Sequence, residues 1–354
     1  MKVSILITTY NLENYIASTL DSVLRQKTSH QVEILVGDDG STDKTRDIVY
    51  QYIAKHPDNI KLYTMPRDEG VAYNRVERSS ANRINLLKHA GGDYISFLDG
   101  DDFYTDDNRI ETMVKVLEDG ANKDCVMCAH NLYMFYESTY DRAEDCPPLC
   151  RAKKEHKWEL KDYWPAIFIQ ANALLFRNIF KEKKNFERLT SDKAFSRNFD
   201  DNNITYFLFA YGNMYYLPVC MGAYRQVENS SWNGIDELKK HCSNMLGLNM
   251  EMNYGRMIAK NQKDAERILD YSYARHLHNM EYIYRHRDEL TKERCSPFYQ
   301  TAVDSDLLMA SALYDYKNTG DHTMNTLPFF IKRGRKVLSG FKAKRSLSKI
   351  IKKY

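Results

Sequence analysis

The stretch that decides the fold is YISFLDGDDFY, residues 94–104. Its first six residues are mostly apolar and typical of a β-strand, and the carboxylates of Asp99, Asp101 and Asp102 follow within four positions. Carboxylates this close repel one another, and each raises the pKa of its neighbours. Two interpretations remain open from these residues alone. One is a solvated turn, in which Asp and Gly are ordinary residues, and the other is a site for Mg²⁺ or Mn²⁺, which take oxygen ligands.

Strand-like and helix-like segments alternate around this stretch. Apolar, β-branched runs predict strands at residues 3–10, 32–39 and 60–65, and apolar residues at helical spacing predict a helix after each of them. This order predicts an α/β fold with a mostly parallel sheet and helices on both faces. Runs without alternation, such as ILVGDD and YISFLD, predict strands that are buried on both sides.

Polar residues follow three of the predicted strands, at the point where each strand ends. They lie at residues 8–11, at Asp38 and Asp39, and at residues 99–102. In open α/β sheets, ligands bind at the carboxyl ends of the strands. We therefore expect these three segments to converge on one crevice.

Length and composition limit the class of protein. The chain has 354 residues, of which 43% are hydrophobic and 28% charged, which suits one large globular domain with an appendage, or two domains. No run of about 20 apolar residues occurs, and the N-terminus is typical of a first strand rather than a signal peptide. The seven cysteines are scattered, and Cys125 and Cys128 lie in a strand-like run, so we interpret this CxxC as core and expect a reduced, cytoplasmic protein.

Three segments in a fixed order carry a family resemblance. VSILITTYN, EILVGDDGSTDKT and YISFLDGDDFY together resemble the family 2 glycosyltransferases with a GT-A fold, over residues 1–232. The resemblance implies an inverting hexosyltransferase that uses a nucleotide-diphospho-sugar, with uridine as the expected nucleotide. The chain has no glycine-rich phosphate loop, so a Mn²⁺ or Mg²⁺ ion held by Asp101 is the implied counter-charge to the diphosphate.

The resemblance also implies a set of donor-binding residues. They are Thr8, Tyr10, Asn11, Glu13, Asp39, Arg75, Arg83, Asp99 and Arg225. Within this set, Thr8, Tyr10 and Asp39 are implied to contact the base and the ribose, and Asp99 a ribose hydroxyl. Arg75 and Arg83 both qualify for the arginine that many members place near the diphosphate, and either one could instead be a solvated helix residue.

The stretch FDDN, residues 199–202, takes the position of the family's catalytic acids. Asp201 stands where the family has the base that removes the acceptor hydroxyl proton, and Asp200 replaces the usual Glu. The alternative for both residues is capping of a helix N-terminus, which favours negative charge.

Val227 stands where many members of the family have a His, so the metal has fewer protein ligands unless Glu228 replaces it. Gln170 and Asn172 are further candidates for the sugar pocket.

The remainder of the chain lies outside the resemblance. Residues 233–330 predict a helical region, and residues 331–354 hold ten Lys and Arg residues and no acid. As a helix this tail is amphipathic and basic, which suits an anionic membrane surface. A solvated tail and a nucleic-acid-binding arm are the alternatives, and the near absence of aromatic residues argues against nucleic acid. We expect a peripheral enzyme at the inner face of the cell membrane, with a cell-surface glycan or a lipid-linked molecule as acceptor.

Two other functions compete with this interpretation. A sugar-phosphate nucleotidyltransferase would share the fold, but such enzymes usually have a Gly-rich first loop, and TTYNLE contains no Gly. A non-catalytic nucleotide-sugar-binding protein is the second alternative, and the intact set of Asp99, Asp101 and Asp201 argues against it.

Overall fold

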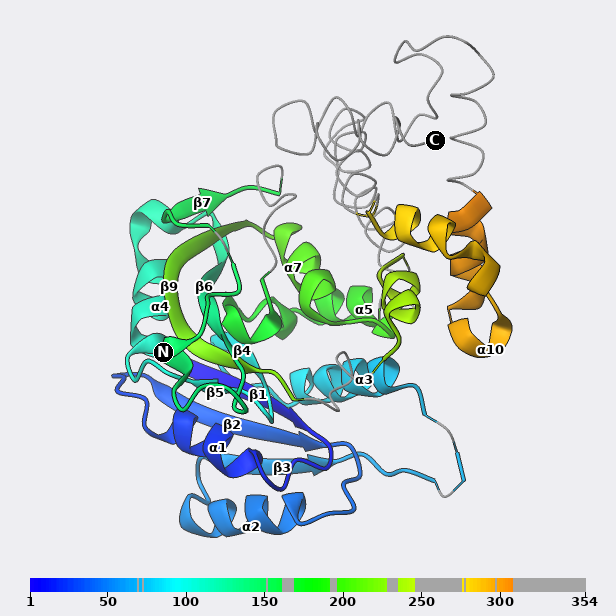
Figure 1. The fold of residues 1–354 in the computed structure, drawn as a ribbon. Coiled ribbons are helices and arrows are strands. Elements are labelled where there is room, and N and C mark those ends of the chain that lie inside the picture. Colours follow the sequence, from blue (N-terminus) through cyan, green and yellow to red (C-terminus); the bar gives the residue numbers. More distant parts are fainter. Residues whose placement is uncertain are drawn as a thin grey trace. The chain divides into compact units, whose positions relative to one another are not determined.

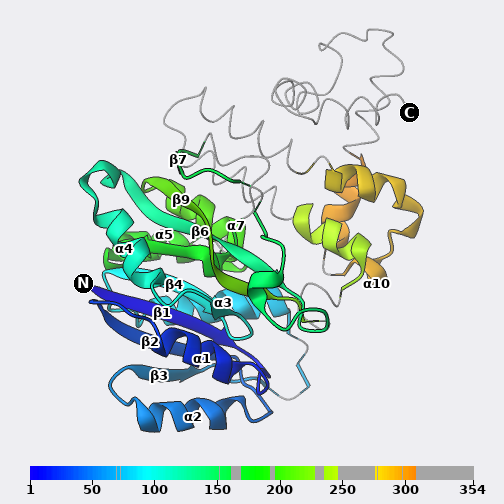
Figure 2. The same ribbon diagram turned by 60° about the vertical axis from the view of Figure 1, so that its left-hand side comes forward.

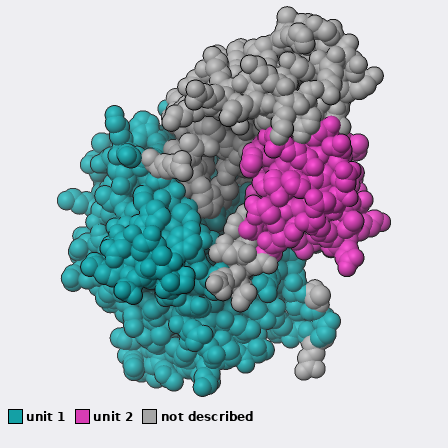
Figure 3. Space-filling view, in the orientation of Figure 1, with its two compact units in different colours: residues 1–233 teal, residues 234–354 magenta. Residues whose placement is uncertain are grey.

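The computed structural model describes residues 1–68, 70–71, 73–150, 152–160, 169–191, 196–227, 235–245, 276, 278–296 and 298–307. The chain divides into two compact units, residues 1–233 and residues 234–354 (Figure 3). The predicted basic tail at 331–354 and most of the predicted helical region at 233–330 lie outside the described residues, as does Glu228.

The first unit is built on a sheet of nine strands, in the order β3-β2-β1-β4-β8-β6-β9-β5, with β7 paired to β9. The strands are β1 Lys2–Thr9, β2 Gln31–Asp38, β3 Ile60–Thr64, β4 Tyr94–Asp99, β5 Phe103–Tyr104, β6 Cys125–Phe135, β7 His156–Trp158, β8 Leu174–Arg177 and β9 Asn213–Arg225. The predicted strands at 3–10, 32–39, 60–65 and 94–99 correspond to β1 to β4.

The direction of the strands changes along the sheet. β3, β2, β1 and β4 are all parallel, as the alternation of strands and helices predicted. Beyond β4 the sheet is mixed, because β8 enters antiparallel between β4 and β6, and β5 and β7 run antiparallel to β9. The α/β class with its GT-A arrangement is therefore confirmed, and the parallel part is concentrated in the first half of the chain.

Helices cover both faces of this sheet (Figures 1 and 2). α1, α2 and α4 share one buried core with alternate residues of β1 and β2, among them Ile5 and Val36. α3 packs on the opposite face, so close that a Cβ added to Gly37 would meet Asn82 Oδ1 at 2.0 Å. The helices in the described part of this unit are α1 Ile16–Leu24, α2 Thr45–Lys55, α3 Arg75–Leu87, α4 Arg109–Glu118, α5 Lys183–Ser191 and α7 Asp201–Phe209, with the short 3₁₀ turns η1 Gly120–Asn122, η2 Ala143–Asp145, η3 Ala171–Ala173 and η4 Ile179–Lys181.

Two expectations about burial are confirmed. Leu35 and Val36 of β2 point to opposite faces and are both buried, and the same holds for Phe97 and Leu98 of β4, so both strands are covered on both sides. Cys125 and Cys128 are buried, unpaired thiols of β6, in agreement with their interpretation as core. Burial raises the pKa of the Cys125 thiol to about 11.

The described residues of the second unit are mostly helical. Helices run over 237–245, 278–285 and 299–307, and the short α10 spans Lys292–Cys295. Across all the described residues of the chain, none of the helices combines the length and the apolar character needed to span a bilayer.

Candidate active site at the carboxyl ends of the central strands

The ends of β1, β2 and β4 lie side by side. Thr8 pairs with Asp99 across β1 and β4, and Thr9 pairs with Asp38 across β1 and β2. The backbone pairing continues past the strands, because the N–H of Asp39 donates to the carbonyl of Thr9 at 2.9 Å. The three polar segments expected to converge therefore form one edge of the sheet.

Asp99 is held on three sides. Its Oδ1 accepts hydrogen bonds from Thr8 Oγ1 at 2.8 Å and from Arg83 Nη2 at 2.9 Å. Its backbone N–H donates to Oδ1 of Asn172 at 3.0 Å. Thr8 and Arg83, both predicted from the sequence, thus lie at the same carboxylate, and Arg83 reaches it from α3.

Asp101 and Asp102 have different surroundings. Asp102 is buried, with Oδ1 accepting from the backbone N–H of Arg225 at 2.7 Å and Oδ2 from the side-chain amide of Asn172. Asp101 is only partly covered, and burial together with the charge of Asp99 raises its pKa to about 6. Burial and the charges of Asp101 and Asp99 raise the pKa of Asp102 well above its ordinary value. Full ionisation of the acids in this loop is therefore unfavourable unless positive charge is added.

The chemistry of this loop fits a hard divalent cation. Within the described residues, no three His, Cys, Asp or Glu side chains are grouped as a metal site would require. At phosphate sites, however, Mg²⁺ is usually held by one or two carboxylates, and substrate phosphates and water complete its shell. The partly covered Asp101 carboxylate, with its raised pKa, provides such an oxygen ligand in a place where added positive charge is favourable.

Arg225, the last residue of β9, holds the same loop from the other side. Its Nε donates to the carbonyl of Asp101 at 2.7 Å, and its guanidinium pairs with Glu137. The guanidinium also lies 5.0 Å from the ring centre of Tyr15 and 4.9 Å from that of Phe103. The contacts show a structural anchor, and the donor-binding role that the family resemblance implies for Arg225 stays a prediction.

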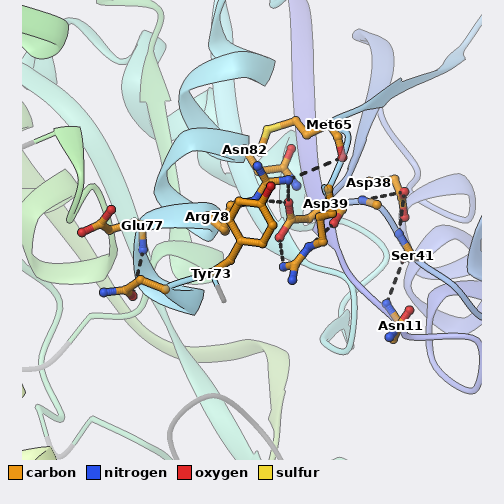
Figure 4. A network of polar contacts seen from close by, with 12 residues as sticks. Asn11, Asp38, Asp39, Ser41, Met65, Tyr73, Glu77, Arg78 and Asn82 are labelled. Carbon is orange, nitrogen blue, oxygen red and sulfur yellow. Dashed lines mark hydrogen bonds and ion pairs between the residues drawn. The ribbon is translucent and has the colours of Figure 1, made fainter. Parts of the chain in front are cut away.

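Asp39 is clamped between two arginines that the sequence did not indicate. Arg78 Nε lies 2.6 Å from Oδ1 of Asp39 (Figure 4). Arg67 contacts Oδ2 and donates through Nε to the Asp39 carbonyl at 2.7 Å. The Arg67 guanidinium also lies over the ring of Tyr10, 3.8 Å from its centre. Two cations thus hold the Asp39 carboxylate, and one of them lies over a partly exposed aromatic ring. Arg75, which the sequence offered beside Arg83 as a candidate for the arginine near the diphosphate, is exposed at the start of α3.

Asn11 and Glu13 connect the first loop to the second. Asn11 adopts a left-handed conformation with φ of 52°, which Asn tolerates better than most residues. Its N–H donates to Ser41 Oγ at 2.9 Å (Figure 4). Its Oδ1 accepts from the N–H of Thr42 at 2.8 Å. Oε2 of Glu13 accepts from the N–H of Lys44 at 3.0 Å. Both side chains lie at the predicted edge, where they fix the loop that carries Tyr10.

Asp200 and Asp201 begin α7 and have different pKa values. Burial raises the pKa of Asp201 to about 6, against the opposing charge of Arg83, and Oδ1 of Asp201 accepts from the N–H of Ala171 at 2.7 Å. Burial and the charge of Asp201 raise the pKa of Asp200 to about 7. Asp200 occupies the N-cap position, but its side chain accepts no capping hydrogen bond from the described backbone of α7. Its Oδ1 accepts instead from Nδ2 of Asn203 at 3.2 Å, so the capping alternative finds no backbone hydrogen bond in the described part of the helix, beyond the favourable position of the charge at the helix N-terminus.

Gln170 and Asn172 differ in whether their side-chain amides have a polar atom without a hydrogen-bond partner. Both are buried, and the Oε1 atom of Gln170 has no hydrogen-bond partner in the described part of the chain. The amide of Asn172 is already engaged by Asp99 and Asp102. Of the two, Gln170 has the atom that a ligand hydroxyl could use.

Comparison of the sequence with curated proteins finds relatives that match up to about half of the chain. An uncharacterized protein of Mycobacterium tuberculosis is 31% identical over 180 residues, which are 49% of this chain and 46% of that protein. The glycosyltransferase GlyA of Streptococcus pneumoniae is 33% identical over 138 residues, 39% of this chain and 18% of that protein. The chain thus spans less than half the length of these relatives.

Solved structures with this fold include TarS from S. aureus. Residues 1–349 of TarS in complex with UDP-GlcNAc match with a TM-score of 0.56 and 17% sequence identity, over 90% of this chain and 92% of that one. The complex of the same protein with UDP gives a TM-score of 0.55. The family model described as "Glycosyl transferase family 2" matches residues 4–183, about half of the chain, which includes β1 from Ser4 onward, β2 to β4 and the Asp99–Asp102 loop. The chain belongs to glycosyl transferase family 2.

Proposed function

We propose that this protein transfers a sugar from a nucleotide-diphospho-sugar to a hydroxyl of a cell-surface glycan or a lipid-linked acceptor, with inversion at the anomeric carbon. The observation that carries the proposal is the position of Arg83. It binds Asp99 at the edge proposed for the donor, and its charge also acts on Asp200 and Asp201. A donor-side carboxylate and a pair of candidate bases therefore share one cation.

The donor is proposed to lie along the ends of β1, β2 and β4. Asp39, held by its two arginines, and the exposed ring of Tyr10 suit a nucleobase and its ribose, and Thr8 and Asp99 suit a ribose hydroxyl. UDP-sugars are the first choice, because a TarS structure with the same fold contains UDP-GlcNAc. The proposal for this chain rests on family membership and on the arrangement of these side chains.

Asp201 is proposed as the base. Its Oδ1 accepts the Ala171 N–H, which leaves Oδ2 to take the proton of the acceptor hydroxyl as the oxygen attacks the anomeric carbon. With a pKa of about 6, the carboxylate is ionised at neutral pH and still basic enough to accept a proton. Attack from the face opposite the leaving diphosphate inverts the anomeric centre. Asp200, with its pKa of about 7, is proposed to orient the acceptor.

A Mn²⁺ or Mg²⁺ ion, when bound, would supply positive charge to the diphosphate. Asp101 is the proposed ligand, because its carboxylate is partly exposed while that of Asp102 is buried and engaged. Arg225 holds the backbone of this loop through the Asp101 carbonyl. Asp99 is kept in place by Thr8 and Arg83, so the loop is fixed at both ends.

Membrane association is proposed for the basic segment at 331–354, which lies outside the described residues. Ten basic residues near an anionic leaflet would each contribute roughly 1 kcal/mol. An enzyme held in this way at the inner face of the membrane would meet acceptors carried on lipid. Peripheral attachment is thus a proposal from the sequence.

Donor hydrolysis tests the proposed activity. A panel of UDP- and GDP-sugars incubated with the protein and Mn²⁺ should release the nucleoside diphosphate slowly without any acceptor. Asp101→Asn should lose nearly all release, whereas Asp124→Asn, a carboxylate at the start of β6 that pairs with Lys157, should retain it. Full activity in excess EDTA would remove the metal from the proposal. Formation of a nucleotide sugar from a nucleoside triphosphate and a sugar phosphate would favour a nucleotidyltransferase.

A further inference from the structure

The 3₁₀ turn η3 touches both groups of acids in the proposed site. The side-chain Oδ1 of Asn172 accepts from the N–H of Asp99 at 3.0 Å, and its Nδ2 donates to Oδ2 of Asp102. One position earlier, the N–H of Ala171 donates to Oδ1 of Asp201 at 2.7 Å. A single turn of backbone therefore contacts the loop proposed for the metal and the proposed base.

The same turn is anchored on its other side by α4. Nη2 of the fully buried Arg109 donates to the carbonyl of Asn172 at 3.0 Å and to that of Leu174 at 3.2 Å. The Nε of Arg109 donates to Nε2 of His130 in β6 at 2.7 Å, which fixes the guanidinium. Oγ of Ser96 in β4 also donates to the Leu174 carbonyl, at 2.5 Å. The turn is thus attached to β4 and, through Arg109, to α4 and β6.

The side chain of Asn172 is not positioned to read the substrate. It is 1% exposed, and both ends of its amide are engaged within the protein. Its contacts instead span the first and last acids of the Asp99–Asp102 loop. We propose that Asn172 is a positioning residue for the transfer reaction, which holds this loop at a fixed distance from Asp201. The inference rests on the proposed function, because it assigns Asn172 a part in the same site.

The reaction explains why such a link would matter. Attack needs the acceptor oxygen, the anomeric carbon and the leaving diphosphate in line, and a displacement of about 1 Å can cost roughly a hundredfold in rate. Asp201 is hydrogen-bonded to Ala171 at the start of the turn, and the Asp99–Asp102 loop is hydrogen-bonded to the next residue, Asn172. Without the Asn172 amide, the loop loses its cross-link to the turn, while the Ala171 contact to Asp201 remains. The two groups of acids could then move relative to each other.

The test compares two asparagines that are each hydrogen-bonded at both ends. Asn178 donates through Nδ2 to the carbonyl of Gly92 at 2.9 Å and accepts the N–H of Phe180 at 3.1 Å, at the opposite end of β4 from Asp99. Asn172→Ala and Asn178→Ala should lower the Tm by similar amounts. Donor hydrolysis with Mn²⁺ should lose about a hundredfold in kcat in Asn172→Ala, with the donor KM changed by less than about threefold, and should be unchanged in Asn178→Ala.

A near-isosteric variant separates hydrogen bonding from shape. Asn172→Leu keeps the approximate size of the side chain and adds no charge, but it can neither accept from the Asp99 N–H nor donate to Asp102. The kcat should therefore still fall at least tenfold, and this variant also serves if Asn172→Ala does not fold. Equal kcat values for the Asn172 and Asn178 variants, beside an active wild type, would overturn the positioning role and leave the proposed function intact. A wild type that hydrolyses no donor would overturn both.

Discussion

Nη2 of Arg83 in α3 lies 2.9 Å from Oδ1 of Asp99 at the end of β4, and the Arg83 side chain is 7% exposed. The charges of Asp201 and Asp200 act on the same guanidinium, against the cost of burying it. A single cation on α3 therefore stabilises carboxylates that belong to two distant parts of the sequence. Changes at this position should affect both groups together.

We expect Arg83→Met to impair folding and chemistry. Removing one partner of a buried ion pair typically costs about 3 kcal/mol in the free energy of unfolding, because the remaining charge is buried without compensation. Arg83 also lowers the pKa of Asp201, so its loss should move the acid limb of the kcat profile to higher pH. Denaturant unfolding and a pH series of donor hydrolysis measure the two effects. The same loss of stability in Arg142→Met, an exposed arginine paired with Glu144, would contradict the explanation.

Asp201→Asn should abolish transfer but spare donor binding. As the proposed base, the residue contacts the acceptor hydroxyl and not the nucleotide, and loss of such a group typically costs about 10²- to 10⁴-fold in rate. In the wild type, kcat should fall below about pH 6, where Asp201 becomes protonated. Calorimetry with UDP and Mn²⁺ should give an unchanged Kd for the variant. Loss of UDP binding in a folded variant would assign Asp201 to the donor site, and unchanged turnover would point to Asp200 as the base.

Asp200→Asn should stabilise the protein at neutral and alkaline pH. The pKa of Asp200 is about 7 in the folded protein and 3.8 in its ordinary state, so the folded form binds this proton more readily than the unfolded form. The stability of the wild type therefore decreases as the pH rises from about 4 to about 7, and the full cost is present above pH 7. We expect the variant to gain about 4 kcal/mol at pH 8 and almost nothing at pH 4. Unfolding midpoints across this range that differ by a constant amount would show that the raised pKa is not the cause.

The first half of the fold could be predicted because its signals are local. The strands β1, β2 and β4 are unbroken apolar runs, and polar residues follow each of them, so both the sheet and its ligand-binding edge follow from the sequence. The family resemblance rests on those same segments.

Other parts of the site depend on contacts that no local pattern records. Arg67 lies in the segment after β3 and Arg78 on α3, and their convergence on Asp39 appears only when these elements are packed. The engagement of Asn172 with Asp99 likewise joins residues 73 positions apart. β8 is a strand of four residues that pairs antiparallel with β4, and an apolar run of that length does not reveal its direction.

Deletion of residues 331–354 should separate donor chemistry from membrane binding. Donor hydrolysis should be unchanged, while transfer to a lipid-linked acceptor in anionic vesicles should fall, because the proposed attraction is electrostatic. Co-sedimentation with vesicles should also weaken as salt rises, since the Debye length shrinks. Equal pelleting of the full chain and the truncated chain would make the segment a solvated extension or a site for another partner.

The two arginines at Asp39 should act on donor affinity through that carboxylate. Arg78→Gln removes the 2.6 Å contact to Oδ1, and Arg67→Gln removes the contact to Oδ2, so either change leaves Asp39 less constrained and its charge less compensated. We expect each variant to raise the Kd of UDP about tenfold, and to leave kcat at saturating donor nearly unchanged, because nucleotide binding contributes equally to the ground state and the transition state.

A double-mutant cycle shows whether the arginines act through Asp39 or contact the nucleotide themselves. If they act through Asp39, the combination of Asp39→Asn with Arg78→Gln should bind UDP no more weakly than Asp39→Asn alone, because the carboxylate that Arg78 orients is already gone. Additive losses in the cycle would mean that Arg78 contacts the nucleotide directly. The same cycle with Arg67 decides the point separately for the guanidinium that lies over Tyr10.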